Sequence, residues 1–352
     1  AMGCLSQRYL DELPGMMPEV DHWVGKNDWK SLVSRIARTH PATSPYDRVI
    51  TTPRHHAYVK IAEGCDRFCA FCAIPIITGR FRSRPHDEII AEVKMLAARG
   101  VSEINVIAQD LSAYGRDLNP ERQSLLARLI DAMADVEGIE RIRLHYAYPA
   151  DFPMDILDVM ARRPNVCKYL DIALQHISDP VLDNMRRHIS SAETRALLAE
   201  IRRRVPGIHI RTTLMVGFPG EGDKEFDELM AFVEEQRFER MGAFAYCEEE
   251  DTYAARHLDD SIPDTVKQSR LDQLMALQEK ISLEIQESKV GSTMRVVVDR
   301  EEPDYYIGRT EYDSPEVDPE VLIEKQRKLK RGEYLDVEIT SALPFELIGR
   351  PV

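Results

Sequence analysis

The sequence predicts an α/β fold: an open, partial (β/α)6 barrel of the TIM type, followed by a small all-β domain. The first observation is a repeat, about six times from residue 56 onward, of a short apolar run and an amphipathic stretch of helical length. This repeat is typical of a parallel sheet covered by helices. The second is the number of units, because a complete barrel of this class has eight. The third is a change near residue 291, where short β-branched runs separated by turns replace the helical rhythm.

The predicted elements of the barrel follow one another at short intervals. The apolar runs lie at 57–62, 104–108, 142–146, 169–174, 208–216 and 241–246. The amphipathic stretches lie at 86–99, 121–134, 153–162, 192–204 and 223–236. A longer amphipathic helix follows, in which apolar side chains keep helical spacing at Leu271, Leu274, Leu277, Ile281 and Ile285.

These patterns divide the chain into four segments. Residues 56–290 form the partial barrel with its closing helix, and residues 291–352 form an OB-like β domain of about five strands. Residues 25–55, rich in Pro, Ser, Thr and Arg, are typical of a linker. Residues 1–24 are interpreted as the end of a preceding domain.

Composition and charge exclude several classes of protein. The 352 residues are 43% hydrophobic and 30% charged, as in an ordinary globular protein. No stretch approaches 18 consecutive apolar residues and the start lacks the pattern of a secretion signal, so we expect a cytoplasmic protein with no membrane partner. The net charge of −14 argues against broad, non-specific binding to nucleic acid.

Three of the six cysteines lie within eight residues, directly after the first predicted strand. Cys65, Cys69 and Cys72 are spaced by four and three residues. Three thiolates can hold three irons of a 4Fe–4S cluster and leave the fourth iron without a protein ligand. The alternatives are a structural zinc site and buried structural thiols. Structural zinc takes four protein ligands, and no fourth Cys or His lies near this segment.

The cysteine segment resembles the motif of the radical S-adenosylmethionine (radical SAM) superfamily. The motif has the same spacing and an aromatic residue before the last cysteine, here Phe71. The resemblance implies that the methionine amine and carboxylate of S-adenosylmethionine chelate the open iron. Reductive cleavage would then yield a 5′-deoxyadenosyl radical.

Longer stretches resemble the methylthiotransferases of this superfamily, in the branch that modifies a ribosomal protein (RimO type). They lie at 106–110, 145–149, 169–179 and 211–221, and residues 308–318 resemble the family's TRAM domain. The resemblance implies transfer of a methylthio group to the β-carbon of an aspartate in the twelfth small-subunit ribosomal protein. It also implies two equivalents of S-adenosylmethionine and a flavodoxin- or ferredoxin-type electron donor.

Several residues are candidates for binding S-adenosylmethionine. Gln109 and Asp110 end the second predicted strand and could bond the methionine amine or the ribose, or they could be ordinary turn residues. The loop with Gly217, Gly220 and Glu221 follows the fifth strand, and its glycines would let the backbone approach a ligand closely. The alternative for this loop is a simple strand-to-helix turn.

Candidate substrate contacts follow the fourth predicted strand. Asp171, Gln175 and His176 would face the open mouth of the partial barrel. A single histidine is more often a structural residue whose hydrogen bonds are satisfied within the protein.

Cys4 belongs to a further resemblance. Residues 3–9 resemble the last cysteine motif of the family's N-terminal domain, in which three cysteines bind a second, auxiliary 4Fe–4S cluster. We expect the chain to begin inside that domain, with Cys4 as a remnant ligand that cannot hold the cluster alone.

Charge in the β domain bears on the substrate. Residues 299–324 carry ten acids and two bases, which favours a basic ribosomal protein as partner of residues 311–318 and makes a nucleic-acid substrate unlikely. The basic run 325–331 points the other way. Two alternatives stay open: the sister branch that modifies transfer-RNA adenosine, and a non-catalytic iron–sulfur or zinc module that binds RNA.

Overall fold

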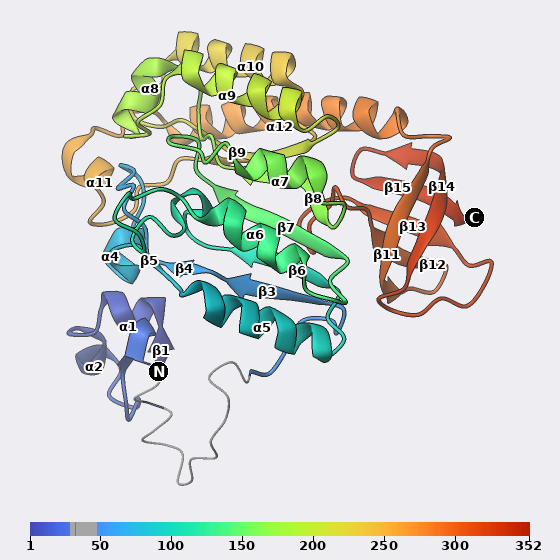
Figure 1. The fold of residues 1–352 in the computed structure, drawn as a ribbon. Coiled ribbons are helices and arrows are strands. Elements are labelled where there is room, and N and C mark those ends of the chain that lie inside the picture. The colour runs from blue at the N-terminus through green and yellow to red at the C-terminus, as the bar shows by residue number, and fades with distance from the viewer. Residues whose placement is uncertain (29–31, 33–47) are drawn as a thin grey trace.

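The computed structural model describes residues 1–28, 32 and 48–352. It contains a curved α/β domain with a small β-barrel beside it, and the N-terminal segment lies at the edge of the α/β domain near α4 (Figure 1). The predicted linker 25–55 falls largely outside the described residues. No helix in the described part of the chain is long and apolar enough to cross a membrane.

A six-stranded parallel sheet forms the centre of the α/β domain, which confirms the predicted open barrel. The strand order is β10-β9-β8-β7-β6-β3, and every neighbouring pair is parallel. The strands are β3 (His56–Lys60), β6 (Glu103–Ile107), β7 (Arg141–Ala147), β8 (Val166–Ile172), β9 (His209–Val216) and β10 (Arg240–Ala245). The short hairpin β4 (Ala62–Glu63) and β5 (Arg82–Ser83) encloses the cysteine segment.

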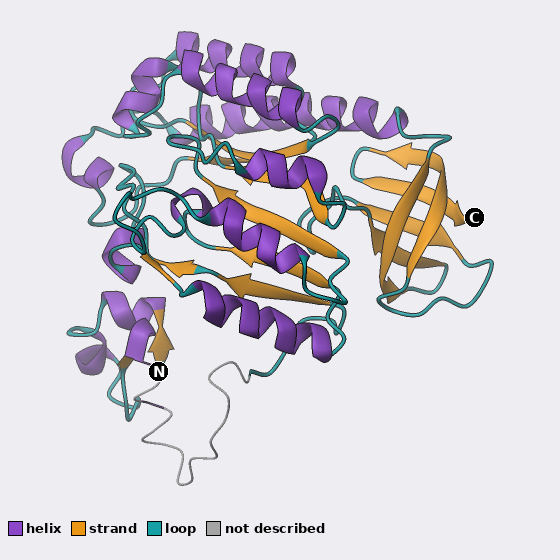
Figure 2. Ribbon diagram, viewed as in Figure 1, coloured by secondary structure: helices purple, strands orange, loops and turns teal. Residues whose placement is uncertain are grey.

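Helices cover the outer face of this sheet (Figure 2). They are α5 (His86–Ala98), α6 (Leu126–Ala134), α7 (Ile156–Arg162), α8 (Asp179–Asn184), α9 (Ser191–Arg204), α10 (Asp223–Gln236) and α12 (Asp264–Glu287). Helix α9 begins at a capping box, in which Ser190 and Glu193 satisfy each other's backbone N–H groups. Helix α6 begins later than the predicted residue 121, because the Asn119 side chain bonds Gly115 and Gln123 and holds a turn there.

The shorter elements complete the chain. They are β1 (Met2–Gly3), α1 (Cys4–Arg8), α2 (Leu13–Met16), β2 (Val24–Gly25), η1 (Lys26–Asp28), α4 (Ile74–Thr78), η2 (Leu111–Ala113) and α11 (Tyr253–His257). Strands β1 and β2 pair in parallel, so residues 2–25 form a small folded unit.

The two faces of the sheet differ in chemistry. On β7, Ile142 and Leu144 join the main hydrophobic core under the helices. Arg141, Arg143 and His145 alternate with them and therefore point to the opposite, inner face. The inner face of this partial barrel is polar, and another part of the protein must satisfy its buried charges.

The β domain is a closed barrel of five strands, as predicted. It consists of β11 (Thr293–Glu301), β12 (Tyr305–Arg309), β13 (Glu320–Glu324), β14 (Tyr334–Leu343) and β15 (Glu346–Pro351). The barrel has its own hydrophobic core, which includes Val296, Val337 and Ile339. Closure leaves no free sheet edge in this domain.

The loop between β12 and β13 enters the amino-terminal end of the partial barrel. Asp313 accepts a hydrogen bond from Arg240 Nε at 3.0 Å. Asp318 accepts from Tyr169 at 2.8 Å and from Arg211 at 3.2 Å. Burial would raise the pKa of Asp313, but the Arg240 guanidinium outweighs it and holds that pKa well below its usual range.

This loop corrects the prediction that residues 311–318 form an acidic docking face. The side chains of Asp313 and Asp318 are only 2% and 3% exposed, and both pair with arginines of the α/β domain. A run of acidic residues in a sequence forms an acidic surface only when the fold does not bury these residues against basic partners. Here the counter-ions are on β9 and β10, far away in the sequence.

A second buried cluster joins the domains around Glu103. Arg309 donates two hydrogen bonds to this carboxylate, at 3.0 and 3.1 Å, and Arg143 lies 3.4 Å from it. Arg309 also bonds Asp299, which pairs with His55 at 2.7 Å. Burial would raise the pKa of Glu103, but Arg309 and Arg143 hold it well below its usual range. The interface is therefore a network of paired, buried charges.

Because of two histidines at this interface, we expect the folded protein to lose stability in acid. Burial lowers the pKa of His56 to about 4 and that of His209, which stacks on Tyr312, to about 3. Both are neutral in the folded protein at pH 5, whereas unfolded histidine binds a proton below about pH 6.5. Stability should thus fall as pH drops from 7 to 5, by about 2 kcal/mol for each histidine.

Urea unfolding at pH 7 and pH 5 measures this effect. His56→Gln should flatten the pH dependence, because glutamine does not titrate in this range. Equal or greater stability at pH 5 in the parent protein would contradict the assignment of two histidines that stay neutral in the folded protein.

Candidate functional site

The cysteine segment forms a loop at the carboxyl end of β3. The loop requires glycine at position 64, where φ is +76° and a Cβ atom would lie 2.2 Å from the Arg80 carbonyl oxygen. The Cys65 amide donates to the Gly79 carbonyl at 3.3 Å, which ties the start of the loop to the residue after α4. This local fold turns the three cysteines toward one cavity.

That cavity has a volume of about 420 Å³ and lies at the carboxyl end of the sheet. All three cysteines line it, together with side chains from the ends of β3, β6 and β7 and from the segment after β8. The other lining residues are Lys60, Arg67, Phe71, Ile74, Ile107, Ala108, Gln109, Tyr146, Ala147, Tyr148, Ala173, Gln175 and Arg187. Parallel α/β folds place ligands at this edge of the sheet.

The donor set of the cavity fits an iron–sulfur cluster better than a single metal ion. No three His, Cys, Asp or Glu side chains among the described residues converge on one point as a mononuclear site requires. A cubane cluster does not need such convergence, because each thiolate binds a different iron. No histidine or carboxylate is among the described residues that line the cavity, so structural zinc would lack a fourth ligand.

The thiols are set in a low-dielectric environment. Burial raises the pKa of Cys65 to about 12 and also raises that of Cys72. Both groups hold their protons when no cation is near, and a polycationic iron core would compensate the thiolate charge.

Cys69 has a cationic neighbour that the sequence did not predict. Arg187 Nη1 donates to its sulfur at 3.2 Å, and the Tyr148 hydroxyl lies 3.6 Å from the same atom. The Tyr148 ring is held between two guanidinium groups, with Arg67 and Arg187 each 4.1 Å from the ring centroid. Arg187 is 3% exposed, so its charge acts on the sulfur with little screening by water.

Arg187→Met should lower the midpoint potential of the cluster. Reduction adds negative charge, which the guanidinium stabilises through its hydrogen bond to Cys69. We expect a decrease on the order of 50 mV, because a charged hydrogen bond is worth ~1.5 kcal/mol and 59 mV corresponds to about 1.4 kcal/mol for one electron. A redox titration followed by electron paramagnetic resonance measures the shift.

Arg186→Met is the matched control for this experiment. Arg186 is exposed and stacks on Tyr253 instead, with its guanidinium carbon 3.6 Å from the ring centroid. Arg186 also lines a hollow that reaches Cys69 and Cys72 from outside, but water screens its exposed charge, so its replacement should shift the potential much less than Arg187→Met does. An unchanged potential in Arg187→Met would show that the Cys69 contact has no electronic effect.

Of the two residues predicted to end the second strand, only Gln109 lines the cavity. Its Nε2 lies 3.5 Å from Glu63, and its Oε1 has no partner among the described residues, which leaves an acceptor for a ligand. Asp110 is 2% exposed and accepts from Arg67 at 2.7 Å. It therefore positions Arg67 and does not face the cavity itself.

The glycine loop after β9 does not reach the cavity. Glu221 is buried and pairs with Arg270 of α12 at 2.9 Å. A Cβ atom at Gly217 would lie 2.3 Å from the Lys267 side chain, so glycine there permits close packing of α12. Neither Gly217, Gly220 nor Glu221 lines the cavity, and their placement supports the alternative of a structural strand-to-helix turn.

The three predicted substrate contacts are also separated. Gln175 lines the cavity and adopts φ +73°, which turns the chain at the mouth. His176 is fully buried and bonds Glu221 at 3.2 Å, as a structural histidine does. Asp171 does not line the cavity, and its carboxylate lies 3.7 Å from both His145 and Arg211.

Tyr146 is another lining residue absent from the predicted site. It lies at the end of β7 with φ +65°, and its side chain is 52% exposed at the mouth. A positive φ is uncommon for a tyrosine and accompanies functional sites. Tyr146 could have been predicted from its position at the carboxyl end of a barrel strand. No sequence pattern indicated Arg187.

A smaller hollow of about 220 Å³ reaches Cys69 and Cys72 from outside the cavity. Its rim includes the half-exposed apolar side chains of Phe68 and Ile76. Nearby, Cys4 is exposed on α1, which packs beside α4.

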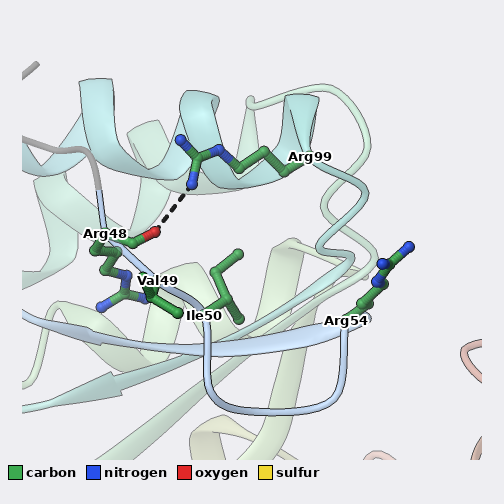
Figure 3. A pocket seen from close by; sticks show the side chains of 5 residues that line it. All are labelled: Arg48, Val49, Ile50, Arg54 and Arg99. Carbon is green, nitrogen blue, oxygen red and sulfur yellow. Dashed lines mark hydrogen bonds between the residues drawn. The ribbon is translucent and has the colours of Figure 1, made fainter. Parts of the chain in front are cut away.

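Another hollow, of about 550 Å³, lies beside the carboxyl-terminal end of α5 and the chain entering β3. Figure 3 shows its lining: Arg48, Val49, Ile50, Arg54 and Arg99. It contains no thiol and lies toward the amino end of the sheet, opposite the cysteines. It is therefore not a candidate for the catalytic cavity.

Comparisons with known proteins agree with this geometry. Residues 59–233 match the radical SAM superfamily, and residues 290–352 match the TRAM domain. The chain is 56% identical over 349 residues to "Ribosomal protein uS12 methylthiotransferase RimO" of Parabacteroides distasonis, covering 99% of this chain and 80% of that relative. It is 55% identical over 353 residues to the protein of the same description from Porphyromonas gingivalis, covering 100% and 81%.

The chain belongs to the RimO family of radical SAM methylthiotransferases. RimO membership confirms the family, the class of enzyme and the TRAM domain that the sequence predicted. Among solved structures, coproporphyrinogen III oxidase (HemN) from Escherichia coli, a radical SAM enzyme, aligns with 80% of this chain and 68% of its own, with a TM-score of 0.48 and 18% identity. The individual ligand residues stay predictions, which the cavity supports.

Proposed function

We propose that this protein adds a methylthio group to the β-carbon of an aspartate in ribosomal protein uS12. The observation that carries the proposal is the 56% identity, over nearly the whole chain, to a uS12 methylthiotransferase. A cavity lined by three thiols, at the edge of the sheet where such folds place their chemistry, is consistent with it.

In this proposal Cys65, Cys69 and Cys72 each bind one iron of a 4Fe–4S cluster. When bound, the cluster and S-adenosylmethionine supply a one-electron cleavage that permits removal of hydrogen from a carbon with no acidic proton. The chain's own residues bind and orient the reactants and exclude water. Phe71 contributes to this enclosure, because it lines the cavity and packs edge-to-face on buried Phe218 at 6.1 Å.

The charged side chains of the lining suit one group of S-adenosylmethionine, its carboxylate. Three cationic side chains, Lys60, Arg67 and Arg187, line the cavity, and no described carboxylate does. Lys60 and Arg67 already pair with Glu63 and Asp110. S-adenosylmethionine is itself a sulfonium cation, so these side chains suit only the carboxylate of its methionine part. The free Oε1 of Gln109 offers an acceptor to an amine or hydroxyl group of the same ligand.

Tyr146 and Gln175 are the residues we assign to the protein substrate. Both line the cavity at its mouth, and Tyr146 is half exposed there. An exposed aromatic side chain beside a cavity contributes large contact area to a protein partner.

Two further components belong to the proposal. A flavodoxin- or ferredoxin-type protein would supply the electron, and the 220 Å³ hollow that opens on Cys69 and Cys72 offers a short path to the cluster. An auxiliary 4Fe–4S cluster would include Cys4, which is exposed on α1, as one ligand. We also infer a cytoplasmic enzyme, because its substrate belongs to the ribosome.

Product analysis tests the proposal. The enzyme, as expressed from its gene, is reconstituted anaerobically and incubated with S-adenosylmethionine, dithionite and either purified uS12 or transfer RNA. Mass spectrometry should find one methylthio group in place of one hydrogen on a uS12 aspartate. A uS12 variant with that aspartate changed to alanine is the control and should stay unmodified. Methylthiolated adenosine in transfer RNA, with unmodified uS12, would favour the sister branch.

A further inference from the structure

Strand β10 forms one edge of the parallel sheet and carries a glycine in its interior. Met241 and Ala243 pack against the main hydrophobic core. Gly242 and Phe244 alternate with them and therefore face the inner side of the partial barrel. The side chain of Phe244 is 62% exposed there, so its ring is open to an occupant of the barrel.

No contact within the described residues accounts for Gly242. Glycine inside a strand weakens the strand and marks a bulge, or a site where a ligand or another backbone approaches closely. The register between β9 and β10 is unbroken from Arg240 to Ala245, so there is no bulge. A Cβ atom at Gly242 would meet no described atom within 4 Å, so internal packing does not require glycine either. The close approach of another molecule is the explanation that fits.

This part of the inner face is continuous with the cavity that the three cysteines line. Gly242 pairs with Thr213, and Phe244 pairs with Met215, across β9 and β10. On the other side of β9, the Gln175 N–H donates to the Thr213 carbonyl at 2.9 Å, and the Met215 N–H donates to the Gln175 carbonyl at 2.7 Å. Gln175 lines the cavity. Thr213, Met215, Gly242 and Phe244, which we call the β9–β10 strip, therefore lead from the cavity to the edge of the sheet.

The loop after β10 adds negative charge beside the strip. Glu248, Glu249, Glu250 and Asp251 are all exposed. Glu249 pairs with Arg8, whereas Glu248 has no basic partner among the described residues. Ribosomal proteins are commonly basic because they bind RNA, so this loop complements such a partner and repels a phosphate backbone.

We propose that the segment of uS12 that carries the target aspartate lies along the β9–β10 strip, with its backbone against Gly242 and a side chain on Phe244. The missing Cβ atom lets the backbone approach the strand, and the exposed aromatic ring supplies contact area. The aspartate side chain then reaches the cavity past Gln175. The proposal rests on the proposed function, because it names the part of the protein that selects a basic polypeptide for that reaction.

The test adds a side chain at Gly242 in the enzyme as expressed from its gene. Gly242→Leu suits an extended strand, because the backbone there is outside the left-handed region and the added atoms meet no described neighbour. The new side chain fills space in front of the strip. Ala199→Leu is the matched control, because Ala199 is exposed on α9 at the outer face of the sheet.

Isothermal titration calorimetry measures the affinity of each reconstituted variant for purified uS12. Gly242→Leu should bind uS12 at least about 10-fold more weakly, because the substrate backbone can no longer reach the strand. Its iron content, its stability in urea and its 5′-deoxyadenosine formation without uS12 should stay parental. Phe244→Ala should weaken uS12 binding in the same way, Phe244→Tyr should retain it, and Ala199→Leu should match the parent in every measurement.

Three outcomes would overturn the proposal. Parental affinity of Gly242→Leu for uS12 would show that uS12 does not contact the strip. An equal loss in Ala199→Leu would assign the effect to added apolar surface. Loss of 5′-deoxyadenosine formation in Gly242→Leu would show that S-adenosylmethionine occupies the strip. A parent protein that binds uS12 more tightly than Gly242→Leu does, yet does not modify it, would refute the proposed function alone.

Discussion

Replacing Cys65, Cys69 or Cys72 with alanine should remove about four irons per chain from the reconstituted protein and abolish its brown colour. Each residue supplies one of three protein anchors, and two thiolates do not hold a cube whose fourth iron already lacks a protein ligand. The cavity gives no substitute, because no other cysteine, histidine or carboxylate is among its described lining residues. Iron analysis and the visible absorption spectrum measure the loss.

Two other cysteines provide matched controls. Cys167 is buried in β8, 2% exposed, and Cys247 is exposed after β10. Neither lines the cavity, so alanine at either position should leave the iron content and spectrum intact. A full cluster in any one of the three single variants at Cys65, Cys69 or Cys72 would contradict the ligand assignment for that residue.

Glu103→Gln should destabilise the protein by about 3–5 kcal/mol. The substitution removes the carboxylate that pairs with buried Arg143 and leaves buried Arg309 with Asp299 as its remaining acidic partner. Removing one partner of a buried ion pair costs this much because the remaining charge stays out of water. The free energy of unfolding in urea measures the effect.

Glu140→Gln is the control for this prediction. Glu140 pairs with Arg295 at 3.0 Å, but the two side chains are 46% and 61% exposed. Exposed pairs contribute little, and this variant should lose less than about 1 kcal/mol. A similarly small loss in Glu103→Gln would show that the interface does not depend on its central carboxylate.

The sequence predicted those parts of the fold that depend on local pattern. The apolar runs at 142–146 and 169–174 predicted two strands, which the structure contains as β7 and β8. The spacing of Cys65, Cys69 and Cys72, directly after a strand, located the cavity. Each of these signals is contained within a few neighbouring residues of the chain.

The parts that sequence analysis missed depend on contacts between distant residues. Asp318 lies in an acidic segment, yet its partner is Arg211, more than a hundred residues earlier. Arg187 contacts Cys69 across 118 positions, and no periodicity links the two. Glu221 follows a strand with glycines nearby, but Arg270 of α12 occupies its carboxylate. Pairing of this kind becomes visible only when the fold brings the partners together.

Reductive cleavage of S-adenosylmethionine tests the central claim most directly. The protein is reconstituted anaerobically with iron and sulfide and then mixed with S-adenosylmethionine and dithionite, and 5′-deoxyadenosine is quantified by liquid chromatography. The account predicts 5′-deoxyadenosine from the parent protein and from Cys167→Ala, and none from Cys65→Ala, Cys69→Ala or Cys72→Ala. Stoichiometric zinc in the parent protein, with no cluster uptake and no 5′-deoxyadenosine, would contradict it.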